Sequence, residues 1–191
     1  MATTVAPQIL ERLFGNDTSE RFELIDGELR AKPMVSIFHS MMMIWLGRLL
    51  SEQTEKLTDQ ELWVLGDPLA KIREDHWLRP DIAVIQAEDA EAWKYIMPGH
   101  WPLLCVEILS PPDQTIDELL DKCKRFHEQG FEYCWVIAPG SRAAWVYHKN
   151  TEPRWIPANS ALDAGQVVIQ LTDLWRGLKN KRGNRTKEVQ R

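Results

Sequence analysis

Apolar and polar positions follow two different periods along the chain, which predicts both strands and helices. Residues 21–30 show apolar alternation on either side of Asp26-Gly27, a dipeptide that favours the positive φ angles of a two-residue turn. This pattern predicts a β-hairpin. From Ser36, a suitable N-cap, to about residue 55, apolar residues recur every three or four positions, as a helix requires. They are Phe38, Met42, Trp45, Leu46, Leu49 and Leu50.

The rest of the chain predicts a sheet interrupted by a second long helix. Strands are expected at 61–65, 69–73, 79–85 and 102–109. Thr115 to Glu118 fits a capping box that opens a helix running to about Gln129, and Gly130 supplies its left-handed cap. Two apolar segments, 131–139 and 143–148, predict a buried strand and its hairpin partner. Short strands near 154–157 and 166–170 and short helices at 7–14 and 172–178 complete the set. The expected fold class is α/β (α+β), a mixed β-sheet flanked by helices.

The composition fits one globular domain. The chain has 191 residues, of which 44% are hydrophobic and 27% charged, enough apolar material for a core. No stretch approaches the roughly 20 apolar residues of a membrane span, and the first residues lack the pattern of a secretory signal. Three cysteines without metal-ligand spacing fit a reducing compartment. We therefore expect a cytoplasmic protein that does not bind membranes.

Charge is distributed unevenly. The net charge is −5, yet seven of the 23 Lys and Arg residues lie from 176 to 191, beside a single acid, Glu188. We expect one domain over residues 1–178 and a flexible basic tail over 179–191. Such a tail could contact nucleic acid, or it could be a solvated terminus. The acidic remainder argues against sequence-independent wrapping of DNA, but it is compatible with a metal site that needs carboxylates.

Two acidic residues interrupt apolar strands. Asp81 shares a predicted strand face with Ala83 and Ile85, and Glu107 shares one with Cys105 and Leu109. A lone carboxylate in such a position costs several kcal/mol of desolvation unless it is protonated, paired or bound to a metal. Either acid alone could be a strand end in solvent or half of a buried ion pair. Two such carboxylates on adjacent strands would suit Mg²⁺ or Mn²⁺.

Hydrolysis of a phosphodiester also needs a cation near the developing charge. The predicted helix at 115–129 offers Lys122 and Lys124, which flank its apolar stripe on opposite sides. The 100° step of the helix places them about equally far from the centre of the stripe. Spacing alone therefore leaves both open.

An ordered set of short motifs resembles the Uma family of the PD-(D/E)XK nuclease superfamily. The set consists of FELIDGEL, His39 at the start of a helix, RPDIAVI, VEILSP, then Lys122, Phe126 and Gly130 at four-residue steps, and finally EYCWVIAP. It extends over about residues 10–150. The resemblance implies a restriction-endonuclease-like core and a metal-dependent endonuclease acting on DNA.

The resemblance also implies roles for individual residues. Asp81 and Glu107 match the motif acids, and together with the Ile108 carbonyl they would hold a divalent ion. Glu23 matches an N-terminal glutamate and would be a further metal or water ligand. The superfamily lysine normally lies two residues after the glutamate, where this chain has Leu109. The family's four-residue steps favour Lys122 over Lys124 as its replacement.

Some positions depart from the family pattern or have no assigned role. Pro112 and Asp113 stand where small hydroxyl residues are frequent, Phe126 where tyrosine is usual, and Ala138 where aspartate is common. The first two could change how the helix meets the site. His39 matches the family, without an evident role. A surface position for Glu23 and a structural role for His39 are the alternatives to catalysis.

Three functions remain open at this point. The first is a DNA endonuclease, the second a catalytically inactive nucleic-acid-binding or assembly module of the same fold, and the third a hydrolase of RNA or a small phosphodiester. A homodimer is expected by analogy, because cutting two strands needs two sites. Trp77, Trp93 and Trp101 flank the acidic strands and could stack on bases or close a dimer interface; we favour the interface. Trp135 and Trp145 are expected in the core.

Overall fold

The structure is a computed structural model of the 191-residue chain. It describes residues 9, 21–32, 35–57, 61–89, 95–110 and 114–179.

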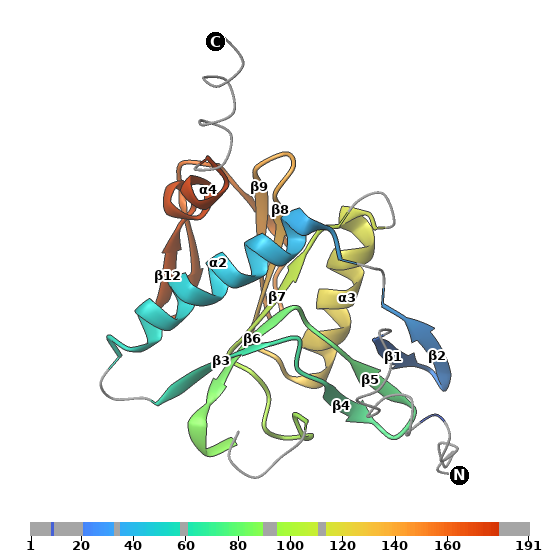
Figure 1. The fold of residues 1–191 in the computed structure, drawn as a ribbon. Coiled ribbons are helices and arrows are strands. Elements are labelled where there is room, and N and C mark those ends of the chain that lie inside the picture. The colour runs from blue at the N-terminus through green and yellow to red at the C-terminus, as the bar shows by residue number, and fades with distance from the viewer. Residues whose placement is uncertain are drawn as a thin grey trace, which may run out of the picture.

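A six-stranded sheet forms the centre of the molecule (Figure 1). Its order is β10 (Arg154–Ile156), β9 (Ala143–His148), β8 (Tyr133–Ala138), β7 (Leu104–Ile108), β6 (Ile82–Gln86) and β3 (Leu62–Gly66). Strands β7 and β8 pair in parallel, and the other neighbours pair antiparallel. The sheet is therefore mixed, as the sequence predicts.

Helices cover both faces of this sheet. Helix α2 (Ile37–Thr54) packs on one face together with α4 (Leu171–Lys179), and α3 (Ile116–Gln129) packs on the other. Because side chains alternate along a strand, those of β7 point in turn to the two faces of the sheet. Leu104, Val106 and Ile108 join the core under α2, whereas Cys105 joins the core under α3. Glu107 lies two residues after Cys105 and therefore points to the same face, the one that α3 covers.

Two smaller sheets complete the fold. One has the order β2 (Glu28–Ala31), β1 (Phe22–Ile25), β5 (His76–Leu78) and β4 (Ala70–Arg73), and it lies beside α3 (Figure 1). The other pairs β11 (Ala161–Ala164) with β12 (Val167–Gln170). A short 3-10 helix, η1 (Ala87–Asp89), follows β6. Among the described residues, no helix combines the length and apolar character needed to cross a membrane.

The strongest local signals in the sequence are confirmed. Asp26 and Gly27 adopt φ angles of 52° and 83° in the β1–β2 hairpin. The Ser36 side chain accepts a hydrogen bond from the His39 amide at the start of α2. The capping box from Thr115 to Glu118 opens α3. These features depend on residues close in sequence, which is why a pattern can find them.

Other expectations were wrong or lie outside the described residues. The strand predicted at 79–85 begins later, at Ile82 in β6 of the central sheet, and the preceding strand, β5, ends at Leu78 in the small sheet. Pro80 falls in the crossing and cannot donate a ladder hydrogen bond. Strands β5 and β11 were missed. The helix predicted at 7–14, apart from residue 9, and the basic tail beyond Lys179 lie outside the described part of the chain.

Candidate active site

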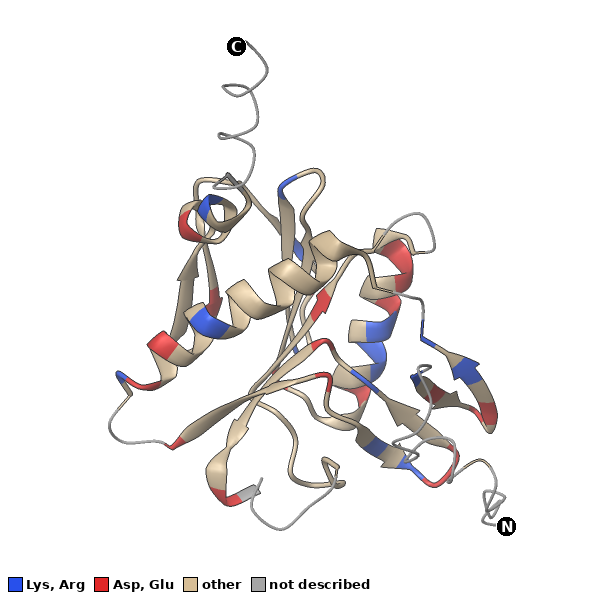
Figure 2. Cartoon of the chain, in the orientation of Figure 1, with Lys and Arg blue, Asp and Glu red and all other residues tan. Residues whose placement is uncertain are grey.

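The two predicted acids meet on adjacent strands. Asp81 immediately precedes β6, and its amide donates to the Val106 carbonyl at 3.0 Å. Because Ile82 pairs with Val106 in antiparallel register, Asp81 lies opposite Glu107. The two residues are only 2% and 1% exposed. In Figure 2, acidic segments gather where the central sheet approaches the small sheet, and basic segments of α3 lie beside them.

Asp81 is held by three groups from different parts of the chain. Its Oδ2 accepts a 2.7 Å hydrogen bond from the Ile108 amide. Its Oδ1 lies 2.7 Å from Lys32 Nζ and 3.3 Å from His39 Nε2. Burial by itself would raise the pKa of Asp81. The charges of Lys32 and His39 and the hydrogen bond from His39 lower it by more, so the pKa falls far below the usual range. Asp81 is therefore ionised at neutral pH.

Lys122 reaches from α3 to the carboxylates. Its Nζ lies 2.7 Å from Glu23 Oε1 and 2.8 Å from Glu107 Oε1, and it donates to the Arg79 carbonyl at 2.8 Å. Burial alone would lower the pKa of Lys122, but Glu107 and Glu23 raise it above its ordinary value. Lys124, the alternative that helical spacing left open, is exposed. Lys122 is thus the lysine that approaches Glu107.

Glu107 is the least solvated acid of the group. Within the described chain, neither of its oxygens accepts a hydrogen bond of good geometry, although Lys122 lies against Oε1. Burial, reinforced by Asp81 and Glu23 and opposed by Lys122, raises the pKa of Glu107 to about 8. Without another cation, Glu107 carries a proton for much of the time at neutral pH. Buried oxygens with so few partners are suited to receive a metal ion.

Glu23 belongs to this site and is not a surface strand residue. It projects from β1 and is buried. Its Oε1 accepts a 2.7 Å hydrogen bond from the Arg79 amide and contacts Lys122. The N-terminal hairpin therefore supplies one wall of the site. We call Glu23, Lys32, Asp81, Glu107 and Lys122 the acid–lysine cluster.

His39 lies at the edge of the acid–lysine cluster. It is buried in the first turn of α2, and within the described chain neither ring nitrogen makes a hydrogen bond of good geometry. The 3.3 Å approach of Nε2 to Asp81 Oδ1 nevertheless places the ring against the carboxylate. His39 is thus positioned to fix the orientation of Asp81 rather than to support a distant part of the core.

Comparison with known proteins assigns the chain to a family. Residues 7–179 match the model of Uma2, described as a putative restriction endonuclease. The chain belongs to the Uma2 family. No curated protein resembles the sequence closely enough to count as a relative.

A solved structure shares the fold. The crystal structure of a putative nuclease belonging to DUF820, from Anabaena variabilis, superposes with a TM-score of 0.74 and 21% identity, covering 89% of this chain and 98% of that one. At that identity the likeness concerns the fold. The cryo-EM structure of a DrdV–DNA complex matches with a TM-score of 0.34 and 11% identity over 74% of this chain and 14% of that one, too low to indicate a shared fold.

Sequence reasoning missed three charged residues of this Uma2 protein's site. Lys32 lies 3.1 Å from Asp67 Oδ1 as well as against Asp81. The Asp67 amide donates to the Asp81 carbonyl at 2.8 Å, and the Arg79 guanidinium lies 3.5 Å from Asp67 Oδ2. A lysine after a hairpin is usually solvated, so nothing in the pattern distinguishes Lys32. The one available signal was the position of Arg79, directly before Pro80-Asp81.

The donor groups fit a magnesium-type ion only in part. Among the described residues, no three His, Cys, Asp or Glu side chains converge on one point. Mg²⁺ commonly takes only one or two carboxylates and fills its shell with water and substrate oxygens. Asp81 and Glu107 meet that requirement, and the Ile108 carbonyl follows Glu107 directly in β7. The chemistry of the donors is suitable, but Lys32 and Lys122 already contact the same carboxylates.

One of the expected tryptophan roles needs correction. Trp77 is 2% exposed, donates to the Glu74 carbonyl and packs against Tyr95, so it can neither stack on bases nor close an interface. Trp101 is half-buried and stacks on Phe131 at 4.9 Å between ring centroids. Trp135 is buried as expected, and Trp145 is half-buried against the core under α3. Trp93, Pro112 and Asp113 lie outside the described residues.

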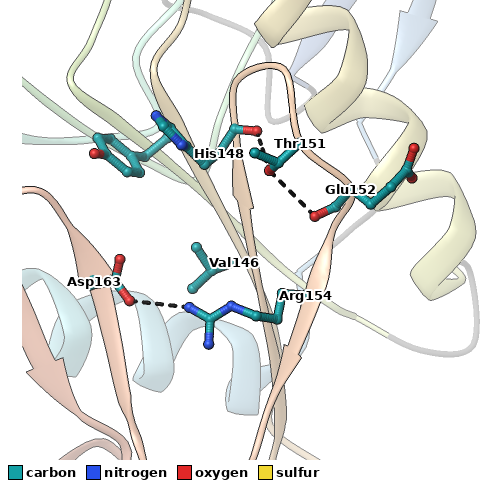
Figure 3. Close-up of a pocket in the computed structure, with 7 residues that line it drawn as sticks. Val146, His148, Thr151, Glu152, Arg154 and Asp163 are labelled. Carbon is teal, nitrogen blue, oxygen red and sulfur yellow. Dashed lines mark hydrogen bonds and ion pairs between the residues drawn. The ribbon is translucent and has the colours of Figure 1, made fainter.

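A separate surface pocket has no residue in common with the acid–lysine cluster. Figure 3 shows Arg154 pointing toward Asp163, with 3.4 Å between Nη2 and Oδ2, and the Tyr133 ring stacks on His148. Its lining residues are Tyr133, Val146, His148, Thr151, Glu152, Arg154 and Asp163. Tyr133 pairs with Leu104 at the start of β7, whereas Glu107 pairs with Val136 near its end. The pocket therefore opens at a different place on the sheet.

Proposed function

We propose that this Uma2 protein is a divalent-metal-dependent endonuclease that hydrolyses phosphodiester bonds in DNA. One observation carries the proposal: Asp81 and Glu107 lie buried and opposite each other on adjacent strands, with the Lys122 ammonium against Glu107. Two desolvated acids and a cation are costly to bury as structural elements. They are the groups that a metal-dependent phosphodiesterase needs.

In this proposal Asp81, Glu107 and the Ile108 carbonyl would hold Mg²⁺ or Mn²⁺, and Glu23 would complete the shell or bind a second ion. The ion supplies Lewis acidity, which acidifies water and polarises phosphate. Asp81 is ready for this task because its low pKa keeps it ionised. Glu107 must give up a proton first, since burial raises its pKa to about 8.

The protein's own groups handle charge and orientation. Lys122 would orient the attacking water or offset the negative charge that develops on phosphate. Its contacts with Glu23, Glu107 and the Arg79 carbonyl restrict the ammonium to a small region. Such a restriction lowers the reorganisation needed when substrate arrives. His39 would keep the Asp81 carboxylate in place.

DNA as the substrate is supported by the description of the family as a restriction endonuclease. The same groups would also cleave RNA or a small phosphodiester, because the chemistry at phosphorus is shared. The substrate therefore has to be tested with matched panels: supercoiled plasmid, linear duplex, single-stranded DNA and single-stranded RNA, each with Mg²⁺ and with Mn²⁺.

We also propose that the protein acts as a homodimer through the N-terminal half of α2. Ile37 and Ile44 are 80% and 74% exposed there, and Phe38 is half-exposed. Exposed apolar residues grouped on one helix are typical of protein interfaces. Sedimentation equilibrium of the wild type should give a dimer mass, and Ile44→Glu should give a monomer. A monomeric wild type at all concentrations would refute this part.

The deciding experiment is a calorimetric titration with Mn²⁺. Asp81→Asn removes the charge but keeps an acceptor for the Ile108 amide. Asp163→Asn, which changes a half-exposed acid on β11, is the matched control. Stoichiometric binding by the wild type and the control, lost in Asp81→Asn, supports the site. Equal binding by all three shows that the ligands are wrong. No binding by any of them favours a catalytically inactive nucleic-acid-binding or assembly module.

A further inference from the structure

Lys32 is a buried cation that the proposed mechanism does not use. It follows β2 directly, and its amide donates to the Arg21 carbonyl at 2.7 Å, which fixes its backbone at the base of the hairpin. Its side chain is 8% exposed. Burying an ammonium costs several kcal/mol unless carboxylates surround it. Lys32 therefore needs its partners, Asp81 at 2.7 Å and Asp67 at 3.1 Å.

Lys32 occupies the oxygen of Asp81 that an incoming ion would need. Oδ2 accepts the Ile108 amide, which is fixed within β7. Oδ1 faces Lys32 and His39. Of these partners, the backbone amide cannot withdraw without disturbing the central sheet. The lysine side chain is flexible and can withdraw.

Lys32 already contacts Asp67 as well as Asp81, so it keeps a partner if it leaves Asp81. The Asp67 carboxylate is almost as buried as the lysine, and it lies beside Asp81, because the Asp67 amide donates to the Asp81 carbonyl. A small movement of Nζ from Asp81 Oδ1 toward Asp67 would keep the ammonium paired. Because the ammonium stays paired with a carboxylate inside the protein, leaving Asp81 avoids most of the free-energy cost of a buried charge without a partner.

The positive charges around the site support the same inference. Lys32 and Lys122 both face the carboxylates that would hold the ion. A divalent cation that enters beside two ammonium groups is repelled by both, and within a few ångströms this repulsion is large in a poorly solvated site. Lys122 lies on Glu107 and Glu23 and has a proposed role there. Lys32 is the cation whose departure would relieve the site.

We propose that Lys32 competes with the divalent ion for Asp81 Oδ1, and that it leaves Asp81 and keeps only Asp67 when the ion binds. The metal-free site is then held closed by its own lysine, and Lys32 sets the metal affinity of the enzyme. This inference rests on the proposed function, because it requires a metal at Asp81.

The test compares Mn²⁺ affinities of variants at position 32 by calorimetry, together with Asp81→Asn. Lys32→Gln removes the charge but keeps amide donors for Asp81 and Asp67, and Lys32→Met removes both charge and donors. Lys32→Arg keeps the charge. Lys124→Gln, on the exposed side of α3, is the control for losing one positive charge elsewhere. Thermal melts monitored by circular dichroism establish that each variant is folded, and Lys32→Gln serves if Lys32→Met does not fold.

We expect Lys32→Gln to bind Mn²⁺ at least about tenfold more tightly than the wild type, with the control and Lys32→Arg no tighter than the wild type. Binding by Lys32→Gln that equals or falls below wild-type binding, while Asp81→Asn abolishes it, overturns the competition and leaves the proposed function intact. If no variant binds Mn²⁺, Lys32→Gln included, both the competition by Lys32 and the proposed function are overturned. Tighter binding by Lys124→Gln as well would show a general charge effect and would also overturn the role of Lys32.

Discussion

The contact between Lys122 and Glu23 gives a sharp test of how the acid–lysine cluster is held together. Lys122→Met removes the ammonium but keeps most of the apolar side chain. It leaves the Glu23 carboxylate buried, and the Arg79 amide still donates to it. Glu23→Gln is milder, because Lys122 retains Glu107 and the Arg79 carbonyl. The double variant removes both charges together.

The geometry sets the magnitude of the effect. Two unit charges 2.7 Å apart attract by roughly 6 kcal/mol at an effective dielectric constant of about 20. Desolvation offsets much of this attraction, and loss of one partner from a buried pair costs about 3–5 kcal/mol in measured cases. We expect about 3 kcal/mol for Lys122→Met, at the low end because the Arg79 amide remains. The coupling between the two changes should be about 2 kcal/mol.

Urea unfolding at pH 7 in the presence of a chelator measures the free energy of unfolding of the wild type, the two single variants and the double variant. Lys124→Met, on the exposed side of the same helix, should lie within about 0.5 kcal/mol of the wild type. A double variant whose loss equals the sum of the two single losses would show no coupling. In that case the Lys122–Glu23 contact does not stabilise the fold, and this reasoning about the cluster fails.

Three further predictions concern proton linkage, a glycine and a helix cap. Burial raises the pKa of Glu107 from 4.5 to about 8, so between these values the folded state holds a proton that the unfolded state has lost. The free energy of unfolding of the metal-free protein should therefore fall as pH rises through this window, by at most ~1.4 kcal/mol per pH unit. Urea unfolding at several pH values should show a weaker dependence on pH for Glu107→Gln. An unchanged dependence would contradict the raised pKa of Glu107. Gly130→Ala should lower the melting temperature and cost more than about 1 kcal/mol, since Gly130 has φ 119° and an added Cβ would lie 2.7 Å from Trp101 Cδ1; a melt like that of the wild type would refute this. Thr115→Ala removes the side-chain acceptor of the Glu118 amide and should cost about 1 kcal/mol in urea unfolding, whereas a neutral result would mean that packing alone fixes the start of α3.

Local signals in the sequence determined much of the secondary structure. The β1–β2 hairpin depends on Asp26 and Gly27, and α3 depends on its capping box and on Gly130. Each of these features is decided by residues within a few positions of one another. The mixed sheet followed from where such elements fall along the chain. Strand β5 and the crossing at residues 79–81 did not, because a short segment does not reveal which sheet it joins.

The sequence also indicated the acids, because a carboxylate in an apolar strand is costly wherever the strand goes. Asp81 and Glu107 were found by that rule alone, and the family resemblance added Glu23 and chose Lys122. Periodicity could not separate Lys122 from Lys124, since both flank the same apolar stripe. The tertiary structure decides between them by placing the β1 hairpin and the central sheet on one side of α3.

Only the tertiary structure revealed Lys32 and the burial of Trp77. Lys32 is 49 residues from Asp81 in the chain, and nothing near it in sequence marks it as a buried cation. Trp77 lies in a short strand whose partners, β1 and β4, are brought together by folding. Local patterns report what a segment tends to form, but charge pairing and burial depend on which distant segments meet, and that is fixed only when the sheets and helices pack.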